Sequence, residues 1–173
     1  LGSTGLETIF DAFRDAFSNY QTRISLTFEE FRLLLARRRV DLSLSVGLFR
    51  EDELVGFVLN GYGEKGGRIL AYDSGTGIRT AYQGQGFGSL LLSGNLDHLN
   101  ERGIETYILE VIASNDRAYR LYAGFGFRRI REFSCFFRES SSIPERTPLN
   151  GIAVSVLIPG TLPSFDPGGF FDY

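Results

Sequence analysis

The residues best suited to chemistry include a glycine-rich loop between two apolar segments of this 173-residue chain. The loop consists of Gln83, Gly84, Gln85, Gly86, Phe87 and Gly88. An apolar run precedes it at residues 69–78 and a leucine-rich segment follows at residues 87–100, so we expect it to join a strand to a helix N-terminus. Backbone N–H groups at such a terminus favour an anion, and glycines allow a close approach. The sequence therefore predicts a diphosphate site, with an ordinary turn as the alternative.

A second stretch, residues 108–127, combines an apolar run with a helix start and a helix stop. Ser114 or Asn115 can cap the helix, because its side-chain oxygen can accept an otherwise unpaired backbone amide. Gly124 and Gly126 can supply the left-handed stop. Between these signals, apolar residues recur at helical spacing, namely Ala118, Leu121, Tyr122 and Phe125. The stretch therefore predicts a strand followed by a capped helix.

Both stretches resemble sequence patterns of the GNAT acetyltransferase superfamily. Residues 83–88 fit the pattern Q/R-x-x-G-x-G/A, and the second stretch fits N-x-x-A-x-x-L-Y-x-x-x-G-F through Asn115, Ala118, Leu121, Tyr122, Gly126 and Phe127. The resemblance covers about residues 6–138 and is strongest over residues 71–130. It implies an α/β fold with a mixed, mostly antiparallel central sheet that is flanked by helices on both faces.

The resemblance also implies an N-acetyltransferase that moves an acetyl group from acetyl-CoA directly to a primary amine in a ternary complex. The glycine loop would hold the pyrophosphate of the donor. Its pantetheine arm would lie between a splayed pair of parallel strands, near the main chain of Gly77 and Ile78. Arg79, Arg120 and Arg128 are candidate contacts for the phosphates. The alternatives are a module that binds acyl-CoA without turnover, a dinucleotide-dependent enzyme, and one half of a larger acetyltransferase.

Tyr122 is the candidate general acid, because the family's tyrosine at this motif position often lies near the CoA sulfur and its ordinary pKa of about 10 keeps it protonated. The alternative is a core residue with its hydroxyl bonded to the backbone. Glu110 is the candidate base, acting through a water, since burial in an apolar strand would raise its pKa. It could instead face outward beside an arginine. Asp73 and Tyr72 are reserve candidates, and Asn115 is a candidate contact for the cofactor arm.

Hydrophobic periodicity predicts the remaining elements. We expect helices at residues 6–20 and 27–38, the second with a capping box, and antiparallel strands at 42–48, 54–62 and 68–78. After the helix at 87–100 we expect a strand through Glu110 at 108–112, the capped helix, and a strand at 127–138. The three strands before the loop argue against a dinucleotide-dependent enzyme. The strand with which the family usually opens is expected to be absent or vestigial.

Composition narrows the class of protein. The net charge of −3 gives no electrostatic case for nucleic acid. A single cysteine, Cys135, cannot form an internal disulfide, and no apolar run is long enough for a membrane span. We therefore expect a cytoplasmic protein that binds no membrane and no metal. Its partner would be a small-molecule or peptide amine, and its state a monomer or homodimer.

The last part of the chain differs in character. Residues 139–173 hold all 5 prolines and several glycines, with one strand-like run at 152–158. We expect a GNAT domain at residues 1–138 and then a tail. The run at 152–158 is either the last strand of the sheet or the start of a further domain.

Overall fold

A computed structural model of the chain describes residues 1–19, 24–134 and 136. Four strands form one sheet in the order β1-β2-β3-β4. They are β1 (Val46–Arg50), β2 (Glu53–Lys65), β3 (Arg68–Ile78) and β4 (Thr106–Ile108). The first two pairs are antiparallel and the β3–β4 pair is parallel. The predicted mixed, mostly antiparallel sheet is confirmed.

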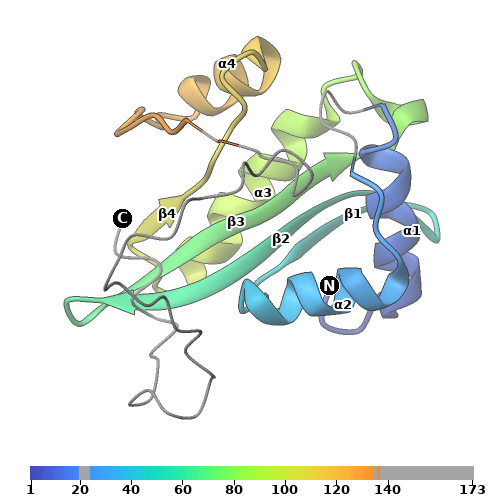
Figure 1. Cartoon of the computed structure of the whole chain (residues 1–173), viewed down its shortest axis with the longest axis horizontal. Helices are drawn as coiled ribbons and strands as arrows, with labels where there is room; N and C mark the ends of the chain where they lie inside the picture. Colours follow the sequence, from blue (N-terminus) through green and yellow to red (C-terminus); the bar gives the residue numbers. More distant parts are fainter. Residues whose placement is uncertain (20–23, 135, 137–173) are drawn as a thin grey trace, which may run out of the picture. The chain divides into compact units, whose positions relative to one another are not determined.

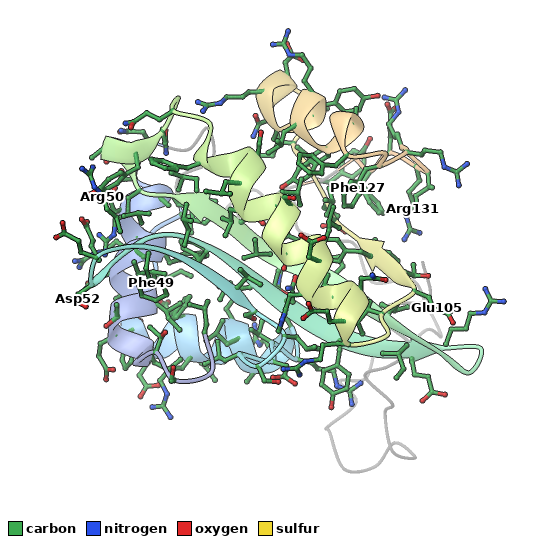
Figure 2. The ribbon with its side chains drawn as sticks, turned by 180° about the vertical axis from the view of Figure 1, so that it is seen from behind. Phe49, Arg50, Asp52, Glu105, Phe127 and Arg131 are labelled. Carbon is green, nitrogen blue, oxygen red and sulfur yellow. The ribbon has the colours of Figure 1, made fainter. Side chains whose placement is uncertain are left out.

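Helices cover both faces of this sheet. Figure 1 shows α1 (Leu6–Ala16) and α2 (Phe28–Arg37) on one face, and α3 (Phe87–Glu101) on the other. A short 3-10 turn, η1 (Thr80–Tyr82), leads from β3 toward α3, and α4 (Asp116–Gly124) follows β4. Seen from behind in Figure 2, α3 crosses the sheet in front of β2 and β3. The predicted α/β fold with helices on both faces is therefore confirmed.

The main core lies between α1, α2 and β2. Phe31 of α2 and Phe57 of β2 are fully buried, and the Phe13 ring of α1 lies 5.1 Å and 5.9 Å from their ring centroids. The predicted capping box is present, because the Thr27 hydroxyl accepts from the Glu30 backbone N–H while the Glu30 carboxylate accepts from that of Thr27. Helix α1 ends at Ala16, earlier than the predicted residue 20. The aromatic residues of the first two helices therefore serve mainly as core.

The predicted strand at residues 42–48 begins four residues late, at Val46. The Asp41 carboxylate accepts the Ser43 backbone N–H at 2.7 Å, and the Asp41 carbonyl accepts that of Leu44 at 3.1 Å. These bonds turn the chain before it can pair with β2. Leu44 is nonetheless buried, so the alternating pattern predicted the buried side but not the strand.

The strands predicted at residues 108–112 and 127–138 also differ from what the structure shows. Strand β4 ends at Ile108 instead of spanning residues 108–112, because it pairs with β3 over only three residues. Residues 127–134 take no strand conformation, since none of the described strands pairs with them. Residues 1–5 contain a turn and no strand.

The chain divides into two compact units, Leu1–Arg128 and Arg129–Tyr173. Within the described part of the second unit, Arg129 pairs with Glu132, and the Arg131 guanidinium lies 5.0 Å from the centroid of the exposed Phe133 ring. Residues 139–173, with the predicted strand at 152–158, lie outside the described residues. The proposed division into domains therefore stays a prediction.

Candidate active site

The glycine loop lies between η1 and α3, as predicted. Gly84 and Gly86 have φ of 81° and 86°, in the left-handed region that favours glycine, and Gly86 is the N-cap of α3. A Cβ on either would meet no atom within 4 Å, so their outer side is open. The Phe87 and Gly88 N–H groups at the start of α3 have no carbonyl one turn earlier to bond, so they can bind an anion, whereas the Ser89 N–H donates to the Gly86 carbonyl at 3.0 Å.

Side-chain amides fix the shape of this loop. Gln83 Nε2 donates to the Ile78 carbonyl at 2.9 Å, and Gln85 Nε2 donates to the Ala81 carbonyl at 3.0 Å. The Ile78 carbonyl, predicted to bond the pantetheine arm, therefore already accepts one hydrogen bond. Gly77 is explained by packing, since a Cβ there would lie 2.6 Å from the Phe57 ring and 2.8 Å from the Ala16 methyl group.

A second set of contacts anchors the entry to the loop. Asp15 Oδ1 accepts from the Thr80 backbone N–H at 3.0 Å and from its hydroxyl at 2.7 Å. The Arg79 guanidinium lies 3.6 Å from Asp15 and 3.8 Å from Glu53, and its Nε donates to the Leu54 carbonyl at 2.7 Å. Burial pushes the pKa of Asp15 upward, but the bonds from Thr80 and Arg79 hold it below its ordinary value. Arg79, a candidate phosphate contact, thus has two carboxylate partners inside the protein.

Strands β3 and β4 part at the level of Asp73. They pair over Leu70–Tyr72 and Thr106–Ile108, after which β3 continues to Ile78 without β4 beside it. A bulge lies at the same place, because Asn60 pairs with Asp73 and Leu59 with Gly75, which leaves Ser74 unpaired. The splayed pair of parallel strands that the family resemblance implied is therefore present.

Asp73, a reserve candidate, holds this bulge. Its carboxylate accepts from the Gly75 backbone N–H at 2.8 Å and from the Thr76 hydroxyl at 2.6 Å. Burial raises the pKa of Asp73 to about 6, although these bonds act in the opposite direction. Both of its oxygens are engaged, which favours a role in shaping the opening.

Glu110 lies beyond the end of β4 and is exposed, so the predicted burial is wrong. It lies near enough to Tyr72 for its charge to act on the hydroxyl of that tyrosine. Burial and the neighbouring Glu110 raise the pKa of Tyr72 to about 12, so this hydroxyl stays protonated. The structure thus places the candidate base close to Tyr72, one of the two reserve candidates.

Tyr122 lies on α4 and is partly buried. The Phe127 ring, which lies between α4 and the sheet in Figure 2, is 5.6 Å from the Tyr122 ring and 5.8 Å from that of Tyr107. Asn115 caps α4, because its Oδ1 accepts the Ala118 backbone N–H at 3.1 Å. The predicted cap is confirmed, whereas the roles of Tyr122 and Asn115 toward a cofactor stay predictions.

The candidate acid Tyr122 and the candidate base Glu110 lie toward opposite faces of the sheet, near the place where β3 and β4 part. Tyr122 packs against Phe127, which in turn packs against Tyr107. Tyr107 bonds to Asn60, so both lie on the face of the sheet that α3 covers. Tyr72 shares the other face with α2, since the Arg38 guanidinium lies 5.9 Å from its ring centroid. Adjacent residues of a strand point to opposite faces of the sheet. Tyr72 therefore lies on the opposite face from its neighbours Ala71 and Asp73, and Ala71 is the residue that pairs with Tyr107.

A buried polar network behind the opening was missed by the sequence reasoning. Asn60 Oδ1 accepts from the Tyr107 hydroxyl at 2.8 Å, and Asn60 Nδ2 donates to Asn95 Oδ1 at 2.6 Å and to the Leu44 carbonyl at 2.8 Å. Asn60 and Asn95 are fully buried. The available signal was an asparagine within each of two otherwise apolar segments, one on β2 and one on α3.

Two other kinds of site are absent from the described residues. Among residues 1–19, 24–134 and 136, no group of three or more His, Cys, Asp or Glu side chains could hold a metal ion. In the same residues, no helix combines the length and the apolar character needed to cross a membrane.

Comparisons with known proteins agree with this geometry. Residues 6–127 match the acetyltransferase (GNAT) family. A mycothiol acetyltransferase of Stackebrandtia nassauensis is 33% identical over 102 residues, which are 59% of this chain and 30% of that protein. The ribosomal protein bS18-alanine N-acetyltransferase of Escherichia coli is 50% identical over 46 residues, 27% of this chain and 31% of that protein. The chain thus spans about a third of the length of the curated relatives it matches.

Solved structures show the same fold. The Escherichia coli ribosomal-protein-S18-alanine N-acetyltransferase superposes with a TM-score of 0.61 at 24% identity, covering 76% of each chain. An aminoglycoside acetyltransferase from an uncultured soil metagenomic sample gives a TM-score of 0.60 at 19% identity, covering 80% of this chain and 92% of that one. The family match over residues 6–127 shows that the chain belongs to the GNAT acetyltransferase family.

Proposed function

We propose that this chain is an acetyl-CoA-dependent N-acetyltransferase, which moves an acetyl group to a primary amine by direct transfer in a ternary complex. The observation that carries the proposal is the left-handed glycine loop at the N-terminus of α3, which follows the part of β3 that extends beyond its pairing with β4. The relatives support N-acetylation in particular, because one of them is named an alanine N-acetyltransferase. The acceptor is a small-molecule or peptide amine.

The donor fits the residues of the site. The open side of Gly84 and Gly86 leaves room for a pyrophosphate against the loop 83–88, and the N-terminus of α3 favours its charge. Beyond Tyr72, no described strand pairs with the edge of β3 that faces β4, so the main-chain groups there, including those of Gly77, would be offered to the pantetheine arm. Asn115 lies at the start of α4, where it can reach the same arm. Acetyl-CoA would supply an acyl group that is activated as a thioester.

The chain's own residues then manage the protons. Glu110 takes a proton from the acceptor ammonium, directly or through one water, and passes it to solvent because its side chain is exposed. The freed amine nitrogen bonds to the acyl carbon, and it loses its second proton to water as the carbon–sulfur bond breaks. Tyr122 gives its hydroxyl proton to the departing thiolate, and its own proton is restored from solvent. The products are an amide and the CoA thiol.

The test is thiol release from acetyl-CoA with a panel of primary amines, comparing the wild type with Glu110→Gln. We expect kcat to fall by about 10²-fold or more in this variant. Glu105→Gln is the matched control, because Glu105 is an exposed acid that precedes β4, at the far end of that strand from α4 (Figure 2). Equal rates in the two variants would contradict the role of Glu110. If acetyl-CoA binds but no thiol is released with any of the amines, the non-catalytic alternative would be supported.

A further inference from the structure

The C-terminal end of α2 packs closely against β2 because β2 has a glycine at the point of contact. Gly61 of β2 has no Cβ, and a Cβ there would lie 2.3 Å from the Arg38 carbonyl oxygen. Val40 forms a bridge with Gly61, and the Asp41 backbone N–H donates to the Asn60 carbonyl at 2.9 Å. The backbone of Arg38 therefore rests directly on β2, and no larger residue at position 61 would allow this approach.

This contact places Arg38 beside the candidate catalytic groups. Gly61 pairs with Tyr72 of β3, so the Arg38 side chain reaches across to the next strand, where its guanidinium lies 5.9 Å from the Tyr72 ring centroid. Tyr72 pairs in turn with Ile108 of β4, two residues before Glu110. Glu110 therefore lies close to Tyr72, and its negative charge helps to raise the pKa of the Tyr72 hydroxyl. Arg38, Tyr72 and Glu110 thus form one row across the sheet, on the face that carries α2.

The Arg38 guanidinium has spare hydrogen-bonding capacity. It is exposed, and among residues 1–19, 24–134 and 136 it makes no ion pair or hydrogen bond through its side chain. By contrast, Arg32 on the same helix pairs with Glu29 at 3.0 Å, and Arg79 pairs with Asp15. The Tyr72 ring keeps the Arg38 cation in place without occupying its five N–H donors.

We propose that the acceptor is an amine whose own molecule carries a carboxylate or a phosphate, and that Arg38 binds this anionic group while Glu110 faces the amine. This inference rests on the proposed acetyltransferase function and names the substrate class of the same site. Arg38 would be a specificity-determining residue that contacts the acceptor and takes no part in proton transfer.

The row of Arg38, Tyr72 and Glu110 can bind both the amine and the anionic group of such an acceptor. A carboxylate attracts an ammonium group, and the planar guanidinium of arginine can bind a carboxylate or a phosphate through two parallel hydrogen bonds. Tyr72 lies near both charged groups, and its raised pKa keeps its hydroxyl neutral. Because Arg38 is already held by the ring and by the end of α2, binding the anion would order few further bonds.

The experiment compares acceptors in matched pairs that differ only in the anion. The pairs are β-alanine with β-alaninamide, glucosamine 6-phosphate with glucosamine, and the dipeptide Ala-Asp with Ala-Asn. Thiol release is measured with the wild type, Arg38→Gln, Arg38→Lys and Arg37→Gln. Arg37→Gln removes the same charge from the adjacent residue of α2. The first two pairs distinguish a carboxylate from a phosphate, and the third tests a peptide.

We expect kcat/KM of the wild type to favour the anionic member of at least one pair by about tenfold to about a hundredfold, as for a charge-assisted hydrogen bond. Arg38→Gln should abolish this preference, so that the two members of the pair have similar kcat/KM. Arg38→Lys should restore part of it, because the charge returns without the planar fork. Arg37→Gln should retain the wild-type preference, and unchanged melting curves would show that all variants fold.

Two results would overturn the inference. One is that no anionic acceptor is used better than its neutral partner, whether or not the neutral amines are acetylated. The other is an anion preference that survives in Arg38→Gln. Calorimetric binding of acetyl-CoA to the same preparations separates this failure from failure of the proposed function. Thiol release with no anion preference leaves the acetyltransferase assignment standing. Binding without thiol release supports the non-catalytic alternative, and absence of binding removes both proposals.

Discussion

The Thr76 hydroxyl donates a hydrogen bond of 2.6 Å to the Asp73 carboxylate, across the bulge where β3 parts from β4. Asp73 also accepts from the Gly75 backbone N–H, so one buried carboxylate bonds to both residues that follow the bulge. A bulge bends its strand and re-aims the groups beyond it. This pair of residues therefore shapes the opening in which we place the thioester.

Replacement of Asp73 by Asn should change how stability depends on pH. The folded-state pKa of about 6 exceeds the ordinary value of 3.8, so the folded protein binds this proton more tightly than the unfolded chain. The ionised carboxylate therefore destabilises the fold by up to about 3 kcal/mol above pH 6, and this penalty fades as the pH falls toward 4. Asp73→Asn should lower the free energy of unfolding by about 1 kcal/mol, because the bond to Thr76 or Gly75 is weakened. The same substitution should remove the pH-dependent penalty, because asparagine does not ionise.

Denaturant unfolding of both proteins at about pH 4.5 and about pH 7 measures this effect, since the slope reports the difference in bound protons. The wild type should lose more stability than Asp73→Asn over this interval. Equal changes in the two proteins would contradict the raised pKa of Asp73.

Asn60→Ala should strongly destabilise the fold. The substitution leaves the Tyr107 hydroxyl and Asn95 Oδ1, both inside the protein, without the partner they have now. Each unsatisfied buried group costs about 1–3 kcal/mol, so we expect a total loss of about 2–5 kcal/mol in the free energy of unfolding. Urea denaturation measures it, with Asn100→Ala as the control, because Asn100 is exposed on α3. A loss below about 1 kcal/mol would show that the network contributes little.

Asp15→Ala should weaken binding of acetyl-CoA without contact to it. Asp15 on α1 holds Thr80 through two hydrogen bonds and lies beside Arg79, just before the glycine loop. We expect the KM for acetyl-CoA to rise by roughly tenfold, with a smaller change in kcat, because the loop loses its anchor. Asp11→Ala is the matched control, since Asp11 is an exposed acid one turn earlier that pairs only with Arg14 in the described residues. Equal KM values in the two variants would contradict the anchoring role.

The lowered pKa of Asp15 adds a pH dependence to the same contact. A carboxylate with a depressed folded-state pKa stabilises the fold above its ordinary value of 3.8, and this contribution is lost as the pH falls through the lowered pKa. The difference in stability between the wild type and Asp15→Ala should therefore shrink under strongly acidic conditions. Acid titration followed by circular dichroism would detect it.

Tyr122→Phe should lower kcat by about 10²-fold and leave the KM for acetyl-CoA nearly unchanged, because only the proton donor is lost while the ring still packs on Phe127. Tyr119→Phe is the control, since Tyr119 is an exposed tyrosine on the same helix. Steady-state kinetics of thiol release measures both variants. If Tyr122→Phe retains the rate of the control, the leaving thiolate takes its proton from water instead.

Local signals in the sequence were sufficient for several elements. The bounds of β3, the capping box at Thr27 and the cap at Asn115 follow from short-range chemistry and agree with the structure. The glycine loop was also predictable, since only glycine readily takes the positive φ found at residues 84 and 86.

The remaining features depend on contacts between distant residues. The late start of β1 comes from the turn at Asp41, which competes with an alternating pattern that is otherwise typical of a strand. The exposure of Glu110 follows from the early end of β4, which the apolar run after it does not reveal. Arg38 reaches Tyr72 because Gly61 accepts the end of α2, and no pattern along the chain pairs these residues.

The most direct test of the central claim is titration calorimetry with acetyl-CoA on the wild type, Gly86→Ala and Gly94→Ala. Gly86 has a φ of 86°, which a side chain disfavours, whereas Gly94 lies within α3 with open space around it. We expect saturable binding to the wild type and to Gly94→Ala, and affinity reduced by about tenfold or more in Gly86→Ala. Absence of binding to the folded wild type, or equal affinity in all three proteins, would contradict the assignment of the glycine loop as the donor site.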